Sequence, residues 1–323
     1  MNHKPPQPRW SASLLRRDLN ARAQHLATTT NLLHDQTPGN SPSILFGRDE
    51  QARHGNFHPA SYAAICANPA WSRRLAKVHT AHRKLRARAD WQWMELDCAN
   101  SSDALLMNIF CHPGVFNGDT FAPAIARLLN IDPTAQPHFG INPGVPLNTN
   151  RKNLKAPKKL TDRTEIDLQL NDLFLEAKLT ESSFQTAPLR LIERYRDLEA
   201  VFDLTRLPRT SRIAPNPHPH VEDLSQADDT PPAISISRPA PSLIQSYQLI
   251  RNVLAAYAAN TSFCVLCDAR RSDLIESWYQ VLSAVRHPTF ACRLKLLTWQ
   301  ELAVTLPVDL QHFLNLKYGI HPA

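Results

Sequence analysis

Residues 164–178 read Thr-Glu-Ile-Asp-Leu-Gln-Leu-Asn-Asp-Leu-Phe-Leu-Glu-Ala-Lys, and the fold is organised around this stretch. Apolar and polar residues alternate on both sides of Asn171-Asp172, a pair that suits a two-residue turn. The alternation predicts a β-hairpin in which Leu170 faces Leu173. One face of the hairpin is then apolar and consists of Ile166, Leu168, Leu170, Leu173, Leu175 and Ala177.

The other face of this hairpin carries two opposed carboxylates. The same register places Asp167 opposite Glu176, where Cβ atoms lie roughly 4.5–5.5 Å apart and like charges destabilise the pair. The pair therefore calls for a cation, and Mg²⁺ fits because it binds one or two carboxylates and keeps several waters. Lys178 and Glu165 share this face. The alternative is an amphipathic hairpin whose polar face is simply solvated.

Asp167, followed on the next strand by Glu176-Ala177-Lys178, resembles the signature of PD-(D/E)XK nucleases, with Ile166 in place of the usual proline before Asp167. Four stretches also occur in the order of a bacterial family of restriction-endonuclease-like proteins, and the resemblance covers about residues 50 to 318. They are residues 101–110 (SSDALLMNIF), 176–181 (EAKLTE), 247–251 (YQLIR) and 298–302 (TWQEL). The resemblance implies an α/β fold with a restriction-endonuclease-like core: a central mixed sheet flanked by helices, plus an N-terminal helical appendage.

The resemblance also implies hydrolysis of DNA phosphodiester bonds with Mg²⁺ or Mn²⁺ as cofactor. Asp167 and Glu176 would hold the metal, and Lys178 would assist a metal-bound water. Gln248 is a further catalytic candidate, because a later helix often brings a glutamine to such sites; an exposed helix glutamine is the alternative. Asp103 is either a third metal ligand or a carboxylate stabilised by its own helix dipole.

Several alternatives stay open. Glu165 either holds Lys178 in place or forms a purely structural ion pair. A nucleic-acid-binding module that has lost turnover is the alternative function, although the intact Asp–Glu–Lys set speaks against it. A scaffold protein with a charged surface is a third interpretation. RNA remains an alternative substrate, and the oligomeric state, including a homodimer, is left open.

The charge of the chain indicates which kinds of partner it can bind. The net charge of +7 favours a polyanionic partner. A basic run directly before the hairpin is a candidate nucleic-acid contact or else a solvated loop, and it contains Arg151, Lys152, Lys155, Lys158 and Lys159. The second half of residues 61–88, read as one helix, is also basic and is open to the same two interpretations.

Other classes of protein are excluded by missing motifs. The chain has 8 glycines and lacks a Walker loop, a G-x-G-x-x-G and a G-x-S-x-G, which argues against P-loop motors, Rossmann dehydrogenases and α/β-hydrolases. A signal peptide and a membrane-spanning apolar run are not apparent, so we expect a cytoplasmic protein without a membrane partner. The pair Cys264-x-x-Cys267 falls on a strand, which points its thiols to opposite faces and predicts buried thiols instead of zinc ligands.

The chain divides by composition. Residues 1–45 are polar and are expected to form a mobile or loosely docked arm, with a helix near residues 12–33. Residues 46–323 are expected to form the nuclease-like domain. Within it, residues 46–100 form a helical appendage, and residues 205–242 form a proline-rich loop insertion.

Overall fold

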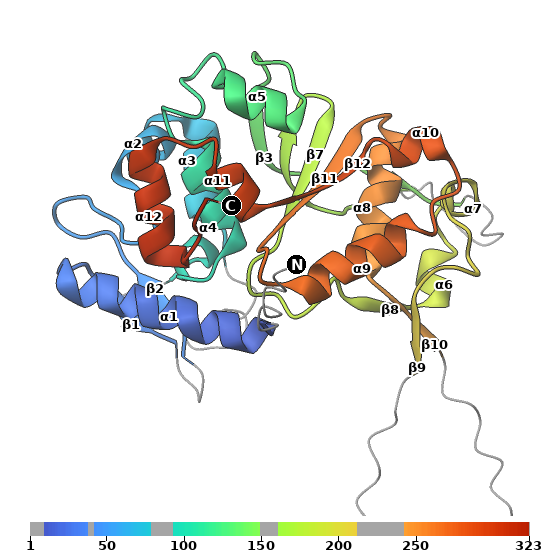
Figure 1. The fold of residues 1–323 in the computed structure, drawn as a ribbon, viewed down its shortest axis with the longest axis horizontal. Helices are drawn as coiled ribbons and strands as arrows, with labels where there is room; N and C mark the ends of the chain where they lie inside the picture. The colour runs from blue at the N-terminus through green and yellow to red at the C-terminus, as the bar shows by residue number, and fades with distance from the viewer. Residues whose placement is uncertain (1–9, 38–41, 79–92, 149–160, 212–241, 323) are drawn as a thin grey trace, which may run out of the picture.

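The computed structural model describes residues 10–37, 42–78, 93–148, 161–211 and 242–322 (Figure 1). Its centre is a five-stranded sheet in the order β12-β11-β7-β6-β3. The strands are β3 (Pro137–Ile141), β6 (Ile166–Leu170), β7 (Leu173–Ala177), β11 (Ser262–Cys267) and β12 (Leu294–Thr298). β3, β6 and β7 are antiparallel neighbours, whereas β7, β11 and β12 run parallel. The predicted mixed sheet is therefore confirmed.

The hairpin has the predicted register. Leu170 pairs with Leu173, and Asn171 in the turn adopts a left-handed φ of 46°. One side chain differs from prediction. Ile166 packs in the opposite core from Leu168, and Gly140, with a φ of 64°, lies at the same level of the neighbouring strand.

Helices cover both faces of this sheet (Figure 1). The first core includes Leu168 and Cys264, and the second includes Phe263 and Cys267, so the two thiols point to opposite faces as predicted. Against the first core lie α1 (Ala12–Thr29), α2 (Pro59–Ala67), α3 (Pro69–Leu75), α4 (Ser102–Phe110), α5 (Pro123–Leu129), α11 (Trp299–Ala303) and α12 (Val308–Tyr318). Against the second lie α6 (Leu189–Ile192), α7 (Leu198–Val201), α8 (Tyr247–Ala258), α9 (Ser272–Leu282) and α10 (Pro288–Ala291).

Short elements complete the chain. A three-stranded sheet, which projects below α6 in Figure 1, consists of β8 (Thr186–Pro188), β10 (Ser242–Gln245) and β9 (Arg209–Ser211). Two further sheets have two strands each: β1 (His34–Gln36) pairs with β2 (Ile44–Phe46), and β4 (Val145–Pro146) pairs with β5 (Thr161–Asp162). A 3₁₀ helix, η2, covers Glu95–Asp97. β9 falls inside the expected proline-rich loop, whose residues 212–241 lie outside the described part.

The long helix expected over residues 61–88 is broken. The helix predicted over residues 61–88 divides at Asn68, because Pro69 lacks the N–H that would continue α2, and it opens α3 instead. Residues 79–92 lie outside the described part.

The N-terminal stretch also differs from expectation. Leu15 and Leu19 of α1 are buried in the first core, so this helix is a packed layer and not a loosely docked arm. The domain boundary at residue 45 stays a prediction. Among the described residues, no helix combines the length and the apolar character that crossing a membrane requires.

Candidate active site

Glu176, near the end of β7, is the most heavily bound carboxylate of the predicted site. Its side chain is buried, with 1% of its surface exposed. Oε1 accepts hydrogen bonds from Lys178 Nζ at 2.7 Å and from Gln248 Nε2 at 2.6 Å. Oε2 accepts a hydrogen bond from Asn252 Nδ2 at 2.7 Å. The structure thus brings three of the four predicted catalytic residues into one cluster.

Asn252 is a site residue that sequence reasoning missed. It follows Gln248 by four positions on α8, so both amides lie on one face of the helix. Thr164 Oγ1 donates to Asn252 Oδ1 at 3.1 Å, which leaves the amide nitrogen to face Glu176. The i, i+4 spacing from Gln248 was the signal in the sequence that could have found it.

Burial and charge act in opposite directions on this cluster. Burial raises the pKa of Glu176, while Lys178 and Asn252 lower it in part. Burial alone would lower the pKa of Lys178, but the carboxylates of Glu176, Glu181 and Asp167 raise it above its usual range. Lys178 therefore stays charged at neutral pH, and it compensates the buried Glu176 carboxylate.

Asp167 lies on β6 beside this cluster. Its Oδ2 accepts a hydrogen bond from the backbone N–H of Ala177 at 2.8 Å, which fixes the carboxylate against the end of β7. Burial, together with the carboxylates of Glu176 and Asp103, raises the pKa of Asp167 well above its usual range. A buried acid beside other acids is a place where a bound cation would relieve repulsion.

Asp103 stands in the first turn of α4 but is bound by cations from α3 and the residues that follow it. Its Oδ2 lies 2.7 Å from Arg74 Nη2 and 2.9 Å from Lys77 Nζ. Glu165 binds the same pair, at 2.9 Å from Arg74 Nη1 and 3.0 Å from Lys77 Nζ. Glu165 thus pairs with these two cations, whereas Lys178 turns to Glu176.

Arg74 and Lys77 belong to the basic segment that the sequence left open as a solvated helix face or a nucleic-acid contact, and sequence reasoning did not connect them with Asp103 or Glu165. Their side chains are 14% and 27% exposed, so they do not form a solvated helix face. Gly140 makes room for Arg74, because a Cβ built on this glycine would lie 1.9 Å from Arg74 Nη1. This left-handed glycine on β3 therefore leaves the space that the Arg74 guanidinium occupies.

The four stretches that carry the family resemblance meet around the chain that leaves β7. Ser102 Oγ, at the start of α4, donates to Glu181 Oε1 at 2.7 Å. Trp299 Nε1, in the first turn of α11, donates to the carbonyl oxygen of Lys178 at 3.0 Å. Together with the bond from Gln248 to Glu176, these contacts hold the predicted catalytic strand from three helices.

The donor set suits a hard divalent cation. Asp103, Asp167 and Glu176 offer carboxylate oxygens, the ligands that Mg²⁺ and Mn²⁺ prefer, and burial together with the neighbouring carboxylates raises the pKa of Asp167. The fit has one condition. Lys178 and Gln248 already bind Glu176, while Arg74 and Lys77 bind Asp103, so a metal would share or replace these partners.

A second cluster of possible metal ligands lies elsewhere in the described residues. Nitrogen and oxygen atoms of His58, His112 and Asp309 lie within 4.8 Å of one another. However, Nδ1 of His58 accepts from the backbone of Ala60 at 3.3 Å, and Nδ1 of His112 accepts from Gly114 at 3.0 Å. The proton of each neutral ring is then on Nε2, the atom that faces Asp309, so these contacts favour a structural cluster over a metal site.

The predicted nucleic-acid contacts cannot be placed beside this site. Arg151, Lys152, Lys155, Lys158 and Lys159 lie in residues 149–160, outside the described part of the chain. Their role stays a prediction.

Comparisons with known proteins identify the family of this chain. No curated protein and no solved structure matches it. A family model described as Restriction Endonuclease associating with ARP matches residues 20–319, a range that contains every site residue discussed above. The match confirms the resemblance to restriction-endonuclease-like proteins. The chain belongs to the family of restriction endonucleases associating with ARP.

Proposed function

We propose that the chain is a metal-dependent nuclease of the PD-(D/E)XK type that hydrolyses phosphodiester bonds in DNA. The observation that carries the proposal is the cluster at the end of β7, where Lys178 and Gln248 bind Glu176 and Asp167 is fixed to the adjoining backbone. Membership of a restriction-endonuclease family supports the same chemistry.

In the proposed mechanism, Asp167 and Glu176 would hold Mg²⁺ or Mn²⁺, with Asp103 as a third ligand. A divalent metal held by these carboxylates would supply Lewis-acid chemistry for phosphodiester hydrolysis. Lys178 donates a hydrogen bond at the reacting centre and neutralises negative charge that develops there. Gln248 and Asn252 orient the Glu176 carboxylate, and the lysines of residues 151–159 hold the DNA backbone.

A plasmid-nicking assay tests this proposal. Supercoiled DNA is incubated with the protein and Mg²⁺, Mn²⁺ or EDTA, and the variants Glu176→Gln and Glu199→Gln are compared with the wild type. Both variants remove one negative charge, but Glu199 is an exposed residue of α7 and serves as the control. Nicking should require metal and should collapse only in Glu176→Gln. An unchanged nicking rate in Glu176→Gln would falsify the catalytic assignment.

A binding module without turnover is the second candidate. The observation in its favour is that Arg74 and Lys77 already neutralise Asp103 and Glu165. Salt-dependent DNA binding without cleavage in any metal would support this candidate. An RNA of the same sequence, assayed in parallel, separates the two nucleic acids.

The partner and the location are part of the proposal as well. The family description names an association with ARP, and we propose that this chain shares it. We also propose a cytoplasmic location. Co-purification of a tagged full-length chain with its ARP partner from the soluble fraction tests both statements.

A further inference from the structure

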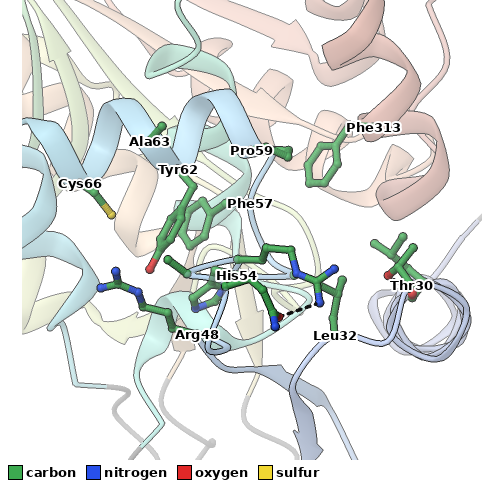
Figure 2. A pocket seen from close by; sticks show the side chains of 15 residues that line it. Thr30, Leu32, Arg48, His54, Phe57, Pro59, Tyr62, Ala63, Cys66 and Phe313 are labelled. Carbon is green, nitrogen blue, oxygen red and sulfur yellow. Dashed lines mark hydrogen bonds between the residues drawn. The ribbon is translucent and has the colours of Figure 1, made fainter.

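We propose that a pocket remote from Glu176 binds a small, mostly apolar molecule that carries one anionic group. The pocket has a volume of about 520 Å³ and lies between α1, the loop of residues 48–57, α2 and α12 (Figure 2). Small-molecule sites typically measure roughly 300–1,000 Å³ and are lined mainly by apolar side chains. None of the lining residues belongs to the cluster around Glu176, so the inference does not depend on the proposed nuclease activity.

The walls of the pocket are apolar and come from distant parts of the chain. Figure 2 shows Leu32, Phe57 and Phe313 around the same space, with Pro59 and Ala63 of α2 above it. Ala63 is exposed even though it belongs to a helix that is packed on its other side. Binding of a ligand that removes such an apolar surface from water is favourable, because it lowers the free energy of the system.

The charges of the lining favour an anion. Among the residues that the structure describes, two arginines line the pocket, and neither an Asp nor a Glu does. Arg53 is already bound, at 2.7 Å to Asp49 and at 3.2 Å to the carbonyl oxygen of Asn31. Arg48 is exposed, and no hydrogen bond or ion pair joins its side chain to another residue in the described ranges. The Arg48 guanidinium is therefore available to pair with a ligand.

Tyr62 adds a neutral donor at the same end of the pocket. Figure 2 places its hydroxyl beside the Arg48 guanidinium, while its ring lies along the wall near Phe57. Burial and the neighbouring Cys66, which also hydrogen-bonds with the hydroxyl, raise the pKa of Tyr62 to about 12. The hydroxyl therefore keeps its proton at neutral pH and can donate to an anion that replaces Cys66 as its partner. An arginine and a hydroxyl at one end of an apolar space match a ligand with a single carboxylate, sulfonate or phosphate group.

The loop that forms the pocket floor is held in place without a ligand. Asn56 Nδ2 donates to the carbonyl oxygens of Leu96 and Cys98, and His54 Nε2 lies 3.1 Å from Asp97. Gly55 is pressed against Phe46, because a Cβ built there would lie 2.2 Å from the ring. A preformed site of this kind costs little ordering entropy on binding.

The test uses two matched fluorescent probes and one internal reporter. 8-Anilinonaphthalene-1-sulfonate is an aromatic anion, and N-phenyl-1-naphthylamine is its neutral counterpart. Cys66 lines the pocket and is exposed, whereas Cys292 is exposed elsewhere and serves as the control thiol. Both probes are titrated against the full-length protein while the reaction of each cysteine with a maleimide is followed by mass spectrometry.

The anionic probe should bind more tightly than the neutral one, and it should slow modification of Cys66 without affecting Cys292. Arg48→Gln should weaken the anionic probe about fivefold, the effect of losing an ion pair of roughly 1 kcal/mol, and should leave the neutral probe unchanged. Arg17→Gln, on an exposed position of α1, removes the same charge and should change neither. Ala63→Trp should fill the pocket and abolish binding of both probes.

Three results would overturn the proposal. Cys66 that reacts equally fast with and without bound probe would place the probe elsewhere on the protein. Equal affinity for the two probes, unaffected by Arg48→Gln, would show that the pocket does not favour a ligand with an anionic group. Absence of binding by either probe, in wild-type protein whose thermal unfolding is cooperative, would show that the pocket is not a ligand site.

Discussion

Replacing Asn252 with alanine should show how much its hydrogen bond from α8 to the Glu176 carboxylate contributes to the free energy of unfolding. The amide donates to a buried carboxylate at 2.7 Å, and it also accepts the hydroxyl proton of Thr164 at 3.1 Å. Hydrogen bonds to charged groups contribute roughly 1.5–3 kcal/mol, and neutral ones roughly 0.5–1.5 kcal/mol. The variant should therefore lose about 2–4 kcal/mol of unfolding free energy at pH 8 in the absence of metal.

The loss should depend on pH, and its sign follows from the pKa of Glu176. Burial already raises this pKa above the unfolded value, and Asn252 lowers it, so the substitution raises it further. A raised carboxyl pKa lowers stability as pH rises, because the folded state then binds the proton more tightly than the unfolded state. The difference between variant and wild type should therefore be largest at pH 8 and should shrink as the pH falls and Glu176 takes up a proton.

Urea unfolding of the metal-free proteins at pH 5, 6.5 and 8 measures this difference directly. Gln280→Ala, at an exposed position of α9, controls for the loss of a polar side chain from a helix. A destabilisation of the same size at all three pH values would refute the reasoning, because it would mean that Asn252 supports packing and not the ionised carboxylate.

Three further predictions concern the surroundings of the site. Replacing Arg74 with Gln and Lys77 with Met frees Asp103 from its two cations. The affinity of the protein for Mn²⁺, measured by calorimetry in the absence of DNA, should therefore rise. An unchanged affinity would argue against Asp103 as a metal ligand. Gly140→Ala should lower the unfolding free energy by about 1–3 kcal/mol, since it forces a left-handed φ on alanine and displaces Arg74; thermal unfolding at the wild-type midpoint would contradict this. The third variant neutralises the lysines before the hairpin, which are Lys152, Lys155, Lys158 and Lys159. It should flatten the salt dependence of DNA affinity by about one unit of slope for each phosphate that the protein no longer neutralises. An unchanged slope would mean that the DNA binds elsewhere on the protein.

Periodicity in the sequence determined the hairpin and, except at Ile166, the faces of its strands. Alternation around Asn171 was enough to set the register of Leu170 against Leu173, because a slip of one residue would turn every leucine to the wrong face. The same rule of period two separated Cys264 from Cys267 across the sheet. These features are local, and each follows from side-chain direction along one strand.

Only the tertiary structure decided the partners of the charges. The register of the hairpin predicts Lys178 as the neighbour of Glu165, yet Glu165 pairs with Arg74, which is 91 residues away along the chain, and Lys178 pairs with Glu176. Local patterns say which face a side chain takes, but not which distant helix packs over that face. Here the Arg74 guanidinium lies against Gly140, which has no side chain to exclude it, and it pairs with both Glu165 and the buried Asp103.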